Sequence, residues 1–159
     1  MHMIINIYSK SSNEIARILS NFHGNSFVFE GIPFPCFEAF VQCLKFPDPE
    51  EQLLVAQMDA KAAKEKGRTQ RWQETGLVYW KGRPIDRYGR EYRELLDRAY
   101  DALCENEEFA DALLRSKGNI LIHTIGKNRK TATVLTAYEF CSMLARKRRM
   151  LSARQKGNP

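Results

Sequence analysis

The sequence lacks long hydrophobic runs, paired cysteines and the features of a secretory signal. No apolar stretch in the 159 residues approaches the roughly 20 residues that a membrane-spanning helix needs. Residues 1–6 have neither a charged n-region nor a long apolar segment, so no secretory signal is expected. The four cysteines form no CxxC pair, which argues against a disulfide framework and against a zinc site. These absences predict a cytoplasmic protein with no membrane association and no bound metal.

What is present is the composition of one ordinary globular domain. Hydrophobic residues make up 43% and charged residues 28% of the chain, a balance that argues against wholesale disorder. No repeat, low-complexity tract or linker divides the sequence. We therefore expect a compact single domain over residues 1–149, followed by a basic, frayed tail over residues 150–159.

The net charge of +6 comes from the last quarter of the chain. Residues 120–159 contain nine lysines and arginines and one acid, Glu139. The densest part is the run Arg146, Lys147, Arg148 and Arg149. Such a cluster can attract phosphate, and it is also typical of a solvated last helical turn that is favoured by the helix dipole. Both interpretations stay open at this point.

Hydrophobic periodicity predicts a mainly α fold with a minor β component of two or three short strands. Strands are expected within residues 3–8, 27–34 and 119–125, the second of these ranges forming a hairpin around Gly31. Helices are expected over 36–46 and 88–103, and after the capping residues Ser11, Asp48, Asn106 and Thr136. Residues 68–86, which include both tryptophans, fit no single pattern.

The expected helix over residues 36–46 is apolar around most of its circumference. Its strongly polar residues are Glu38, Gln42 and Lys45, whose spacing places them in one stripe along the helix. Burying such groups without partners costs about 2–7 kcal/mol for a neutral group and more for a charge. We therefore expect the stripe to face a wet cleft, where the pKa of a glutamate or lysine shifts readily toward catalytic values. A polar seam satisfied by backbone and water is the structural alternative.

Several motifs in and around this helix form a recognisable set. They are Leu19-Ser20-Asn21-Phe22, then Phe27, Gly31 and Pro35, then Glu38-x-x-x-Gln42-x-x-Lys45, and finally Ala63-Lys64-x-x-Gly67-Arg68. Together they resemble the opening signature of the NADAR family, also called YbiA-like, and the likeness extends over about residues 8–146. After the last strand the chain reads His123-Thr124-Ile125-Gly126, where the family usually has Asp-x-x-Trp-Gly. The chain thus resembles a divergent member.

The resemblance implies a YbiA-like helical fold and cleavage of an N-glycosidic bond between ribose and a base-like nitrogen. The implied substrate is a riboflavin-pathway intermediate or an ADP-ribose conjugate, such as ADP-ribosylated guanine in nucleic acid. No metal or redox cofactor is implied.

Breaking a ribosyl C–N bond requires a proton for the departing base and stabilisation of positive charge at the sugar. Glu38 is the candidate acid or base, and a desolvated Lys45 is the candidate amine that forms a Schiff base with the opened sugar. The other candidate substrate contacts are Asn21 and Gln42 for hydroxyls, Arg68 for phosphate, Trp72 or Trp80 for stacking on the base, and His123.

Each of these residues also has a structural interpretation. Asn21 fits a turn, Arg68 a solvated helix end, and a tryptophan a core position. A hypothesis from another class is a non-catalytic accessory protein that binds nucleic acid or a nucleotide through the basic C-terminus, from the Arg146–Arg149 run to Arg154 and Lys156. A third is a degenerate family member that binds a nucleotide without turnover.

Overall fold

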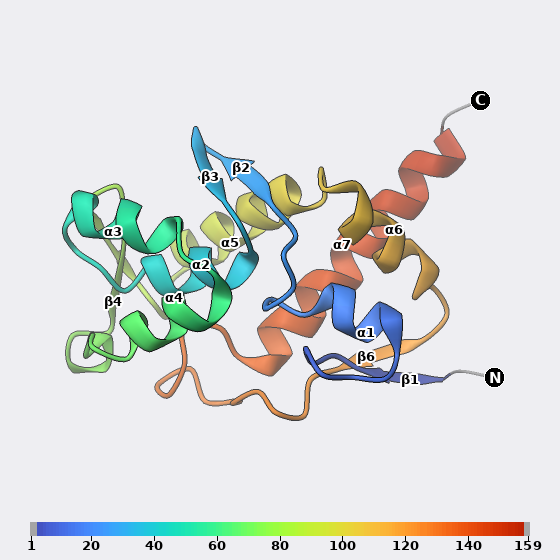
Figure 1. Cartoon of the computed structure of the whole chain (residues 1–159), viewed down its shortest axis with the longest axis horizontal. Helices are drawn as coiled ribbons and strands as arrows, with labels where there is room; N and C mark the ends of the chain where they lie inside the picture. Colours follow the sequence, from blue (N-terminus) through green and yellow to red (C-terminus); the bar gives the residue numbers. More distant parts are fainter. Residues whose placement is uncertain (1–2, 158–159) are drawn as a thin grey trace.

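The computed structural model describes residues 3–157 of the chain (Figure 1). Within these residues the strands are β1 (Ile4–Asn6), β2 (Phe27–Phe29), β3 (Ile32–Phe34), β4 (Leu77–Trp80), β5 (Arg83–Asp86) and β6 (Ile120–Ile122). The helices are α1 (Glu14–Leu19), α2 (Phe37–Cys43), α3 (Pro49–Ala56), α4 (Ala60–Gly67), α5 (Arg90–Leu103), α6 (Glu107–Arg115) and α7 (Ala137–Gly157). A short 3-10 helix, η1 (Trp72–Glu74), precedes β4.

The fold is α+β, with helices predominating as the periodicity predicts. The strands form three separate two-stranded sheets: β1 with β6 in parallel, and the hairpins β2–β3 and β4–β5. The expectation of two or three strands is therefore wrong, since the described residues contain six. The unexpected hairpin lies in the ambiguous stretch, where Lys81 and Gly82 take positive φ angles of 53° and 83° at the turn. Positive φ at both central residues is what a tight hairpin turn requires.

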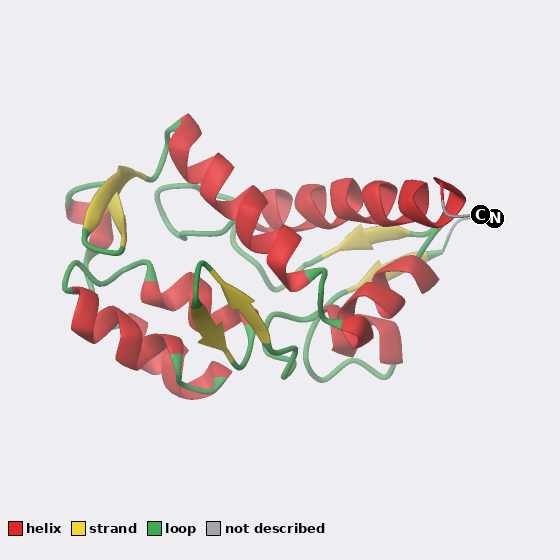
Figure 2. Cartoon of the chain, turned by 90° about the horizontal axis from the view of Figure 1, so that it is seen from above, coloured by secondary structure: helices red, strands yellow, loops and turns green. Residues whose placement is uncertain are grey.

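The molecule has two groups of elements joined by long helices. One group contains α1, α6 and the β1–β6 pair, and the other contains α2, α3, α4 and the β4–β5 hairpin (Figure 1). The two longest helices, α5 and α7, contact each other and appear as long red coils in Figure 2. The segment between β6 and α7, orange in Figure 1, runs from the first group toward the second before α7 begins. Its residues line the same pocket as residues of α2 and α4.

Capping signals explain where most of the helices begin. Asp48 caps α3 with Pro49 at its first position, and Asn106 caps α6, as the sequence predicts. Thr136 and Glu139 form the expected capping box at α7, each side chain accepting from the other's backbone nitrogen. The prediction for α1 is wrong, because Asn13 caps this helix and Ser11 accepts a hydrogen bond from the Asn13 nitrogen.

Two boundaries differ from the sequence prediction. Helix α2 ends at Cys43, so Lys45 lies in the turn that follows it. Helix α7 continues to Gly157 with Leu151 buried, where the sequence suggests fraying from residue 150. Residues 158–159 of the expected tail lie outside the described residues. No helix within residues 3–157 is both long and apolar enough to cross a membrane.

Candidate active site

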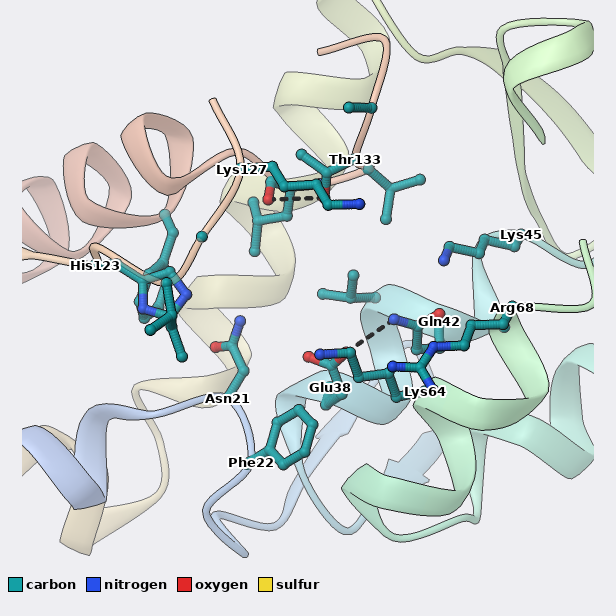
Figure 3. Close-up of a pocket in the computed structure, with 18 of the residues that line it drawn as sticks. Asn21, Phe22, Glu38, Gln42, Lys45, Lys64, Arg68, His123, Lys127 and Thr133 are labelled. Atoms are coloured by element: carbon teal, nitrogen blue, oxygen red, sulfur yellow. Dashed lines mark hydrogen bonds between the residues drawn. The ribbon is translucent and has the colours of Figure 1, made fainter. Parts of the chain in front are cut away.

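A cavity of about 780 Å³ lies between α2 and α4 on one side and the segment that connects β6 to α7 on the other (Figure 3). Its size falls within the range of about 300–1,000 Å³ that is usual for small-molecule sites. Residues 8–10, the α1–β2 loop and η1 also contribute to its walls.

The polar stripe of α2 faces this cavity. The opposite side of the helix carries Phe37 and Phe40, which pack in the aromatic core, so Glu38 and Gln42 are directed toward the open space. Both polar side chains are nevertheless buried, with exposures of 9% and 6%. Gln42 Nε2 donates a hydrogen bond to Glu38 Oε1 at 2.8 Å, which fixes the carboxyl group (Figure 3).

Burial shifts the two ionisable groups of the stripe toward their neutral forms. Desolvation raises the pKa of Glu38, and the hydrogen bond from Gln42 and the charges of Lys64 and Lys45 oppose that rise. Desolvation also lowers the pKa of Lys45, against the opposing effect of Glu38. The cavity therefore combines a carboxyl group that retains its proton to higher pH with an amine that loses its proton at lower pH.

The α1–β2 loop is attached directly to α2. The backbone nitrogen of Glu38 donates to the carbonyl of Asn21 at 3.1 Å, so Asn21 lies at the start of the stripe. The next residue, Phe22, is 36% exposed and also lines the cavity. Lys64 Nζ lies 5.3 Å from the centre of its ring, a cation–π distance that joins this loop to α4.

The opposite wall contains His123, Lys127 and Thr133 (Figure 3). His123 Nδ1 lies 2.6 Å from the carbonyl oxygen of Ile7. Because a carbonyl only accepts, Nδ1 carries the proton in the neutral ring and Nε2 is then an acceptor. The ring packs edge-on against Phe140 with centroids 5.2 Å apart, which holds its orientation.

Positive charge surrounds the mouth of the cavity. Lys64 and Arg68 extend from α4, and Lys127 faces them from the other wall (Figure 3). None of these three forms a salt bridge within residues 3–157, so their charges are available to an anionic ligand. In the same part of the chain, no group of three His, Cys, Asp or Glu side chains could hold a metal ion.

The structure brings most of the predicted site residues together. The cavity is lined by Asn21, Glu38, Gln42, Lys45, Arg68, Trp72 and His123. Trp80 is the exception: it stacks on Phe29 at 5.4 Å, and its Nε1 donates to Glu30. Its alternating position in β4 turns it into the core, so the expectation that it stacks on a substrate base is corrected.

Phe22, Lys64, Lys127 and Thr133 are among the lining residues that were not predicted from the sequence. Phe22 and Lys64 belong to the motifs Leu-Ser-Asn-Phe and Ala-Lys-x-x-Gly-Arg, and this position within a motif is the signal that could have found them. Lys127 and Thr133 come from the irregular segment between β6 and α7, where no periodic pattern indicates which side chains face inward.

The basic run of α7 is only partly exposed, because Lys147 is buried whereas Arg146 and Arg149 are exposed. Lys147 is 4% exposed and donates to Asp97 at 2.9 Å and to Asp101 at 2.6 Å. Arg146 pairs with Asp97 at 3.4 Å, and Arg148 donates to the carbonyl oxygen of Ser116 at 2.9 Å. Three residues of the run therefore stabilise the contacts of α7 with α5 and with the end of α6, and Arg149 is exposed.

Residues 13–149 match the family described as bacteriophage protein GP30.3. The chain belongs to this family. It is 39% identical over 129 residues, covering 79% of the chain and 85% of the relative, to an uncharacterized 17.1 kDa protein in the Gp30-rIII intergenic region of Enterobacteria phage T4. Its structure is also similar to the NMR structure of the Escherichia coli protein YbiA, with a TM-score of 0.69 and 18% identity, covering 100% of this chain and 91% of YbiA. This GP30.3 family member therefore has the fold of YbiA, as the sequence motifs imply.

Proposed function

We propose that the protein is an N-glycoside hydrolase that cleaves the C–N bond between ribose and a base-like nitrogen in a phosphorylated substrate. A ribosylated base and an ADP-ribose conjugate are the substrate classes that we infer. The single observation that carries the proposal is the stripe of Glu38, Gln42 and Lys45 along one wall of a nucleotide-sized cavity. An acid and an amine that are both shifted toward neutrality are the groups such a reaction uses.

Glu38 is the acid in this mechanism. Desolvation raises the pKa of its buried carboxyl group, so a larger fraction of this group carries a proton at a given pH than in a solvated glutamate. That proton is donated to the departing nitrogen as the C–N bond breaks, and the resulting carboxylate then takes a proton from the water that adds to C1 of the oxocarbenium-like sugar. Gln42 holds the carboxyl group in place during both steps, through its 2.8 Å hydrogen bond.

Lys45 supplies a covalent route to the same products. Burial lowers the pKa of its amine, so more of it is unprotonated and nucleophilic near neutral pH. The neutral amine adds to C1 of the ring-opened sugar, the base leaves with a proton, and water hydrolyses the remaining imine. The free sugar and free Lys45 are then restored.

The rim of the cavity supports binding of a phosphorylated substrate. Lys64, Arg68 and Lys127 lie around the mouth, where a guanidinium and two ammonium groups can bind phosphate oxygens. Phe22 is a partly exposed ring whose centre lies 5.3 Å from Lys64 Nζ, and it can stack on the base. The site thus provides separate places for phosphate, sugar and leaving group.

The proposal is tested by assaying Glu38→Gln and Lys45→Ala against a panel of ribosylated bases and ADP-ribose conjugates. Release of free base or ADP-ribose is followed by liquid chromatography. We expect each variant to lose at least about a hundredfold in rate, the usual contribution of a general acid. The exposed Glu94→Gln, whose carboxylate pairs with Arg90 at the surface, is the matched control. Full activity in both site variants would exclude this mechanism.

Nucleic-acid binding through the basic C-terminus is the alternative function, and it has less support. Lys147 is buried against two aspartates and Arg146 pairs with Asp97, which leaves Arg149, Arg154 and Lys156 as the exposed cations for phosphate.

A further inference from the structure

Arg87 is an arginine that is almost completely buried, with 1% of its surface exposed. It follows β5 directly and pairs with Glu139 of α7, its Nη2 lying 2.7 Å from Oε1 and its Nη1 3.1 Å from Oε2. Its Nε and Nη2 also donate to the carbonyl oxygen of Thr133, at 3.1 and 3.0 Å. The ring of Tyr92 lies beneath the guanidinium, 4.9 Å from Cζ. One side chain therefore joins β5, α5, α7 and the segment before α7.

The same segment has three more attachments. The hydroxyl of Tyr92 donates to the carbonyl oxygen of Val134. The capping box of Thr136 and Glu139 closes the start of α7, and Glu139 is the carboxylate that Arg87 holds. The Ala137 nitrogen donates to the carbonyl oxygen of Lys127 at 2.9 Å, so the cluster also fixes the start of the segment.

This cluster lies directly behind the second wall of the cavity. Thr133, Val134 and Leu135 line that wall, and Lys127 extends from the same segment toward the mouth (Figure 3). Residues 123–136 contain neither helix nor strand, and the backbone hydrogen bonds within them are those of two turns, from Gly126 to His123 and from Ala132 to Arg129. Side-chain contacts from β5 and α5 attach the end of the segment to the rest of the protein.

A buried ion pair contributes little net stability compared with apolar residues of the same volume. Its two-point geometry does, however, specify position, because a planar guanidinium matches one orientation of a carboxylate and a carbonyl. Lys147 with Asp97 and Asp101 provides a comparison within the same molecule. That buried cation joins α7 to α5 and does not line the cavity.

We propose that Arg87 is a positioning residue for the active site, holding residues 127–136 so that Lys127 and Thr133 face Glu38 and Lys45 across the cavity. The effect of Arg87 on catalysis rests on the proposed function, but its effect on the position of residues 127–136 does not. Because Glu38 and Lys45 lie on the other wall, loss of Arg87 disturbs substrate binding more than the chemical step.

The first experiment measures backbone hydrogen exchange by mass spectrometry in full-length wild type, Arg87→Lys, Tyr92→Phe and Lys147→Met. Arg87→Lys keeps the positive charge but loses the planar guanidinium that bonds Glu139 and the carbonyl oxygen of Thr133. Tyr92→Phe keeps the ring but loses the hydrogen bond to Val134. We expect at least tenfold faster exchange over residues 127–136 in Arg87→Lys and a smaller increase in Tyr92→Phe. Lys147→Met lowers the melting temperature without this local change. The proposal is overturned if exchange over residues 127–136 is unchanged in both Arg87→Lys and Tyr92→Phe. It is also overturned if Lys147→Met increases exchange there as much as Arg87→Lys does.

The second experiment measures steady-state kinetics of base release for the same variants. We expect KM to rise about tenfold in Arg87→Lys while kcat changes less than threefold, and both constants to stay unchanged in Lys147→Met. A fall in kcat with unchanged KM overturns the positioning role. If the wild type releases no base from any substrate, the proposed function fails, and the exchange experiment still decides the role of Arg87. If Arg87→Lys does not fold, Tyr92→Phe provides both readouts.

Discussion

Gly67 and Gln42 meet where α4 packs on α2, so closely that a Cβ atom on residue 67 would lie 1.8 Å from Gln42 Oε1. This amide oxygen is buried and has no hydrogen-bond partner within residues 3–157. A buried acceptor left without a donor costs about 1–3 kcal/mol. The arrangement nevertheless directs the amide nitrogen to Glu38, at 2.8 Å. The glycine thus leaves room for a side chain that orients the proposed catalytic acid.

The first prediction concerns Gly67→Ala. Alanine is favoured over glycine inside a helix by about 1 kcal/mol. This gain offsets the cost of displacing the Gln42 amide, so we expect the free energy of unfolding to change little. Loss of the amide hydrogen bond lets the pKa of Glu38 rise further, because that bond lowers it. We expect the rate of base release to fall about tenfold, with a melting temperature close to that of the wild type. Gly157→Ala, with nothing within 4 Å of the new Cβ, is the control. Wild-type activity in Gly67→Ala would show that the position of Gln42 does not matter.

The second prediction concerns stability as a function of pH. Burial raises the pKa of Glu38 in the folded state, so the folded protein binds this proton more tightly than the unfolded chain. The stabilisation of the folded state by this proton is complete below the ordinary glutamate pKa of about 4.3, and it is lost as pH rises through the raised pKa of Glu38. Glutamine does not titrate, so Glu38→Gln does not lose this stability as pH rises. We therefore expect the variant to be more stable than the wild type at pH 8 and similar to it at pH 4, as measured by urea unfolding. A less stable variant at pH 8 would mean that the folded protein favours the charged carboxylate.

The third prediction distinguishes the covalent route. Lys45→Arg keeps the positive charge but has no amine that forms an imine. Borohydride reduction during turnover is expected to add the mass of the sugar to wild-type protein and to Lys64→Arg, and to leave Lys45→Arg unmodified. Because burial lowers the pKa of Lys45, the yield of adduct should rise with pH at a lower pH than for a solvated lysine. An active wild type that forms no adduct would assign the reaction to Glu38 alone.

Local signals in the sequence predicted much of the framework. Asp48 followed by Pro49, and Asn106, are caps whose partners lie within a few residues, so the sequence alone contains the interaction. The stripe of Glu38 and Gln42 follows from helical spacing and lines the cavity even though α2 is shorter than expected.

Long-range contacts explain what the sequence could not predict. Trp80 enters the core because a hairpin turn at Lys81 and Gly82 sets which face of β4 is inward. The charge of Lys147 is visible in the sequence, but its aspartate partners lie on α5, 46 and 50 residues away. The end of residues 123–136 is held by long-range contacts such as that between Arg87 and the carbonyl oxygen of Thr133, and no local pattern encodes such contacts.

The fourth prediction compares the two groups of cations. Lys64→Gln and Lys127→Gln remove charges at the mouth of the cavity, whereas Arg146→Gln removes a charge from α7 outside it. A hydrogen bond to a charged group is worth about 1.5–3 kcal/mol, so we expect KM for a phosphorylated substrate to rise about tenfold or more in each rim variant. Arg146→Gln should keep the wild-type KM. Titration with single-stranded DNA at several salt concentrations checks the alternative function, since each lost phosphate contact lowers the slope of log K against log salt by about 0.7. A lower slope in Arg146→Gln together with an unchanged KM in the rim variants would favour nucleic-acid binding by α7 over the proposed glycosidase site.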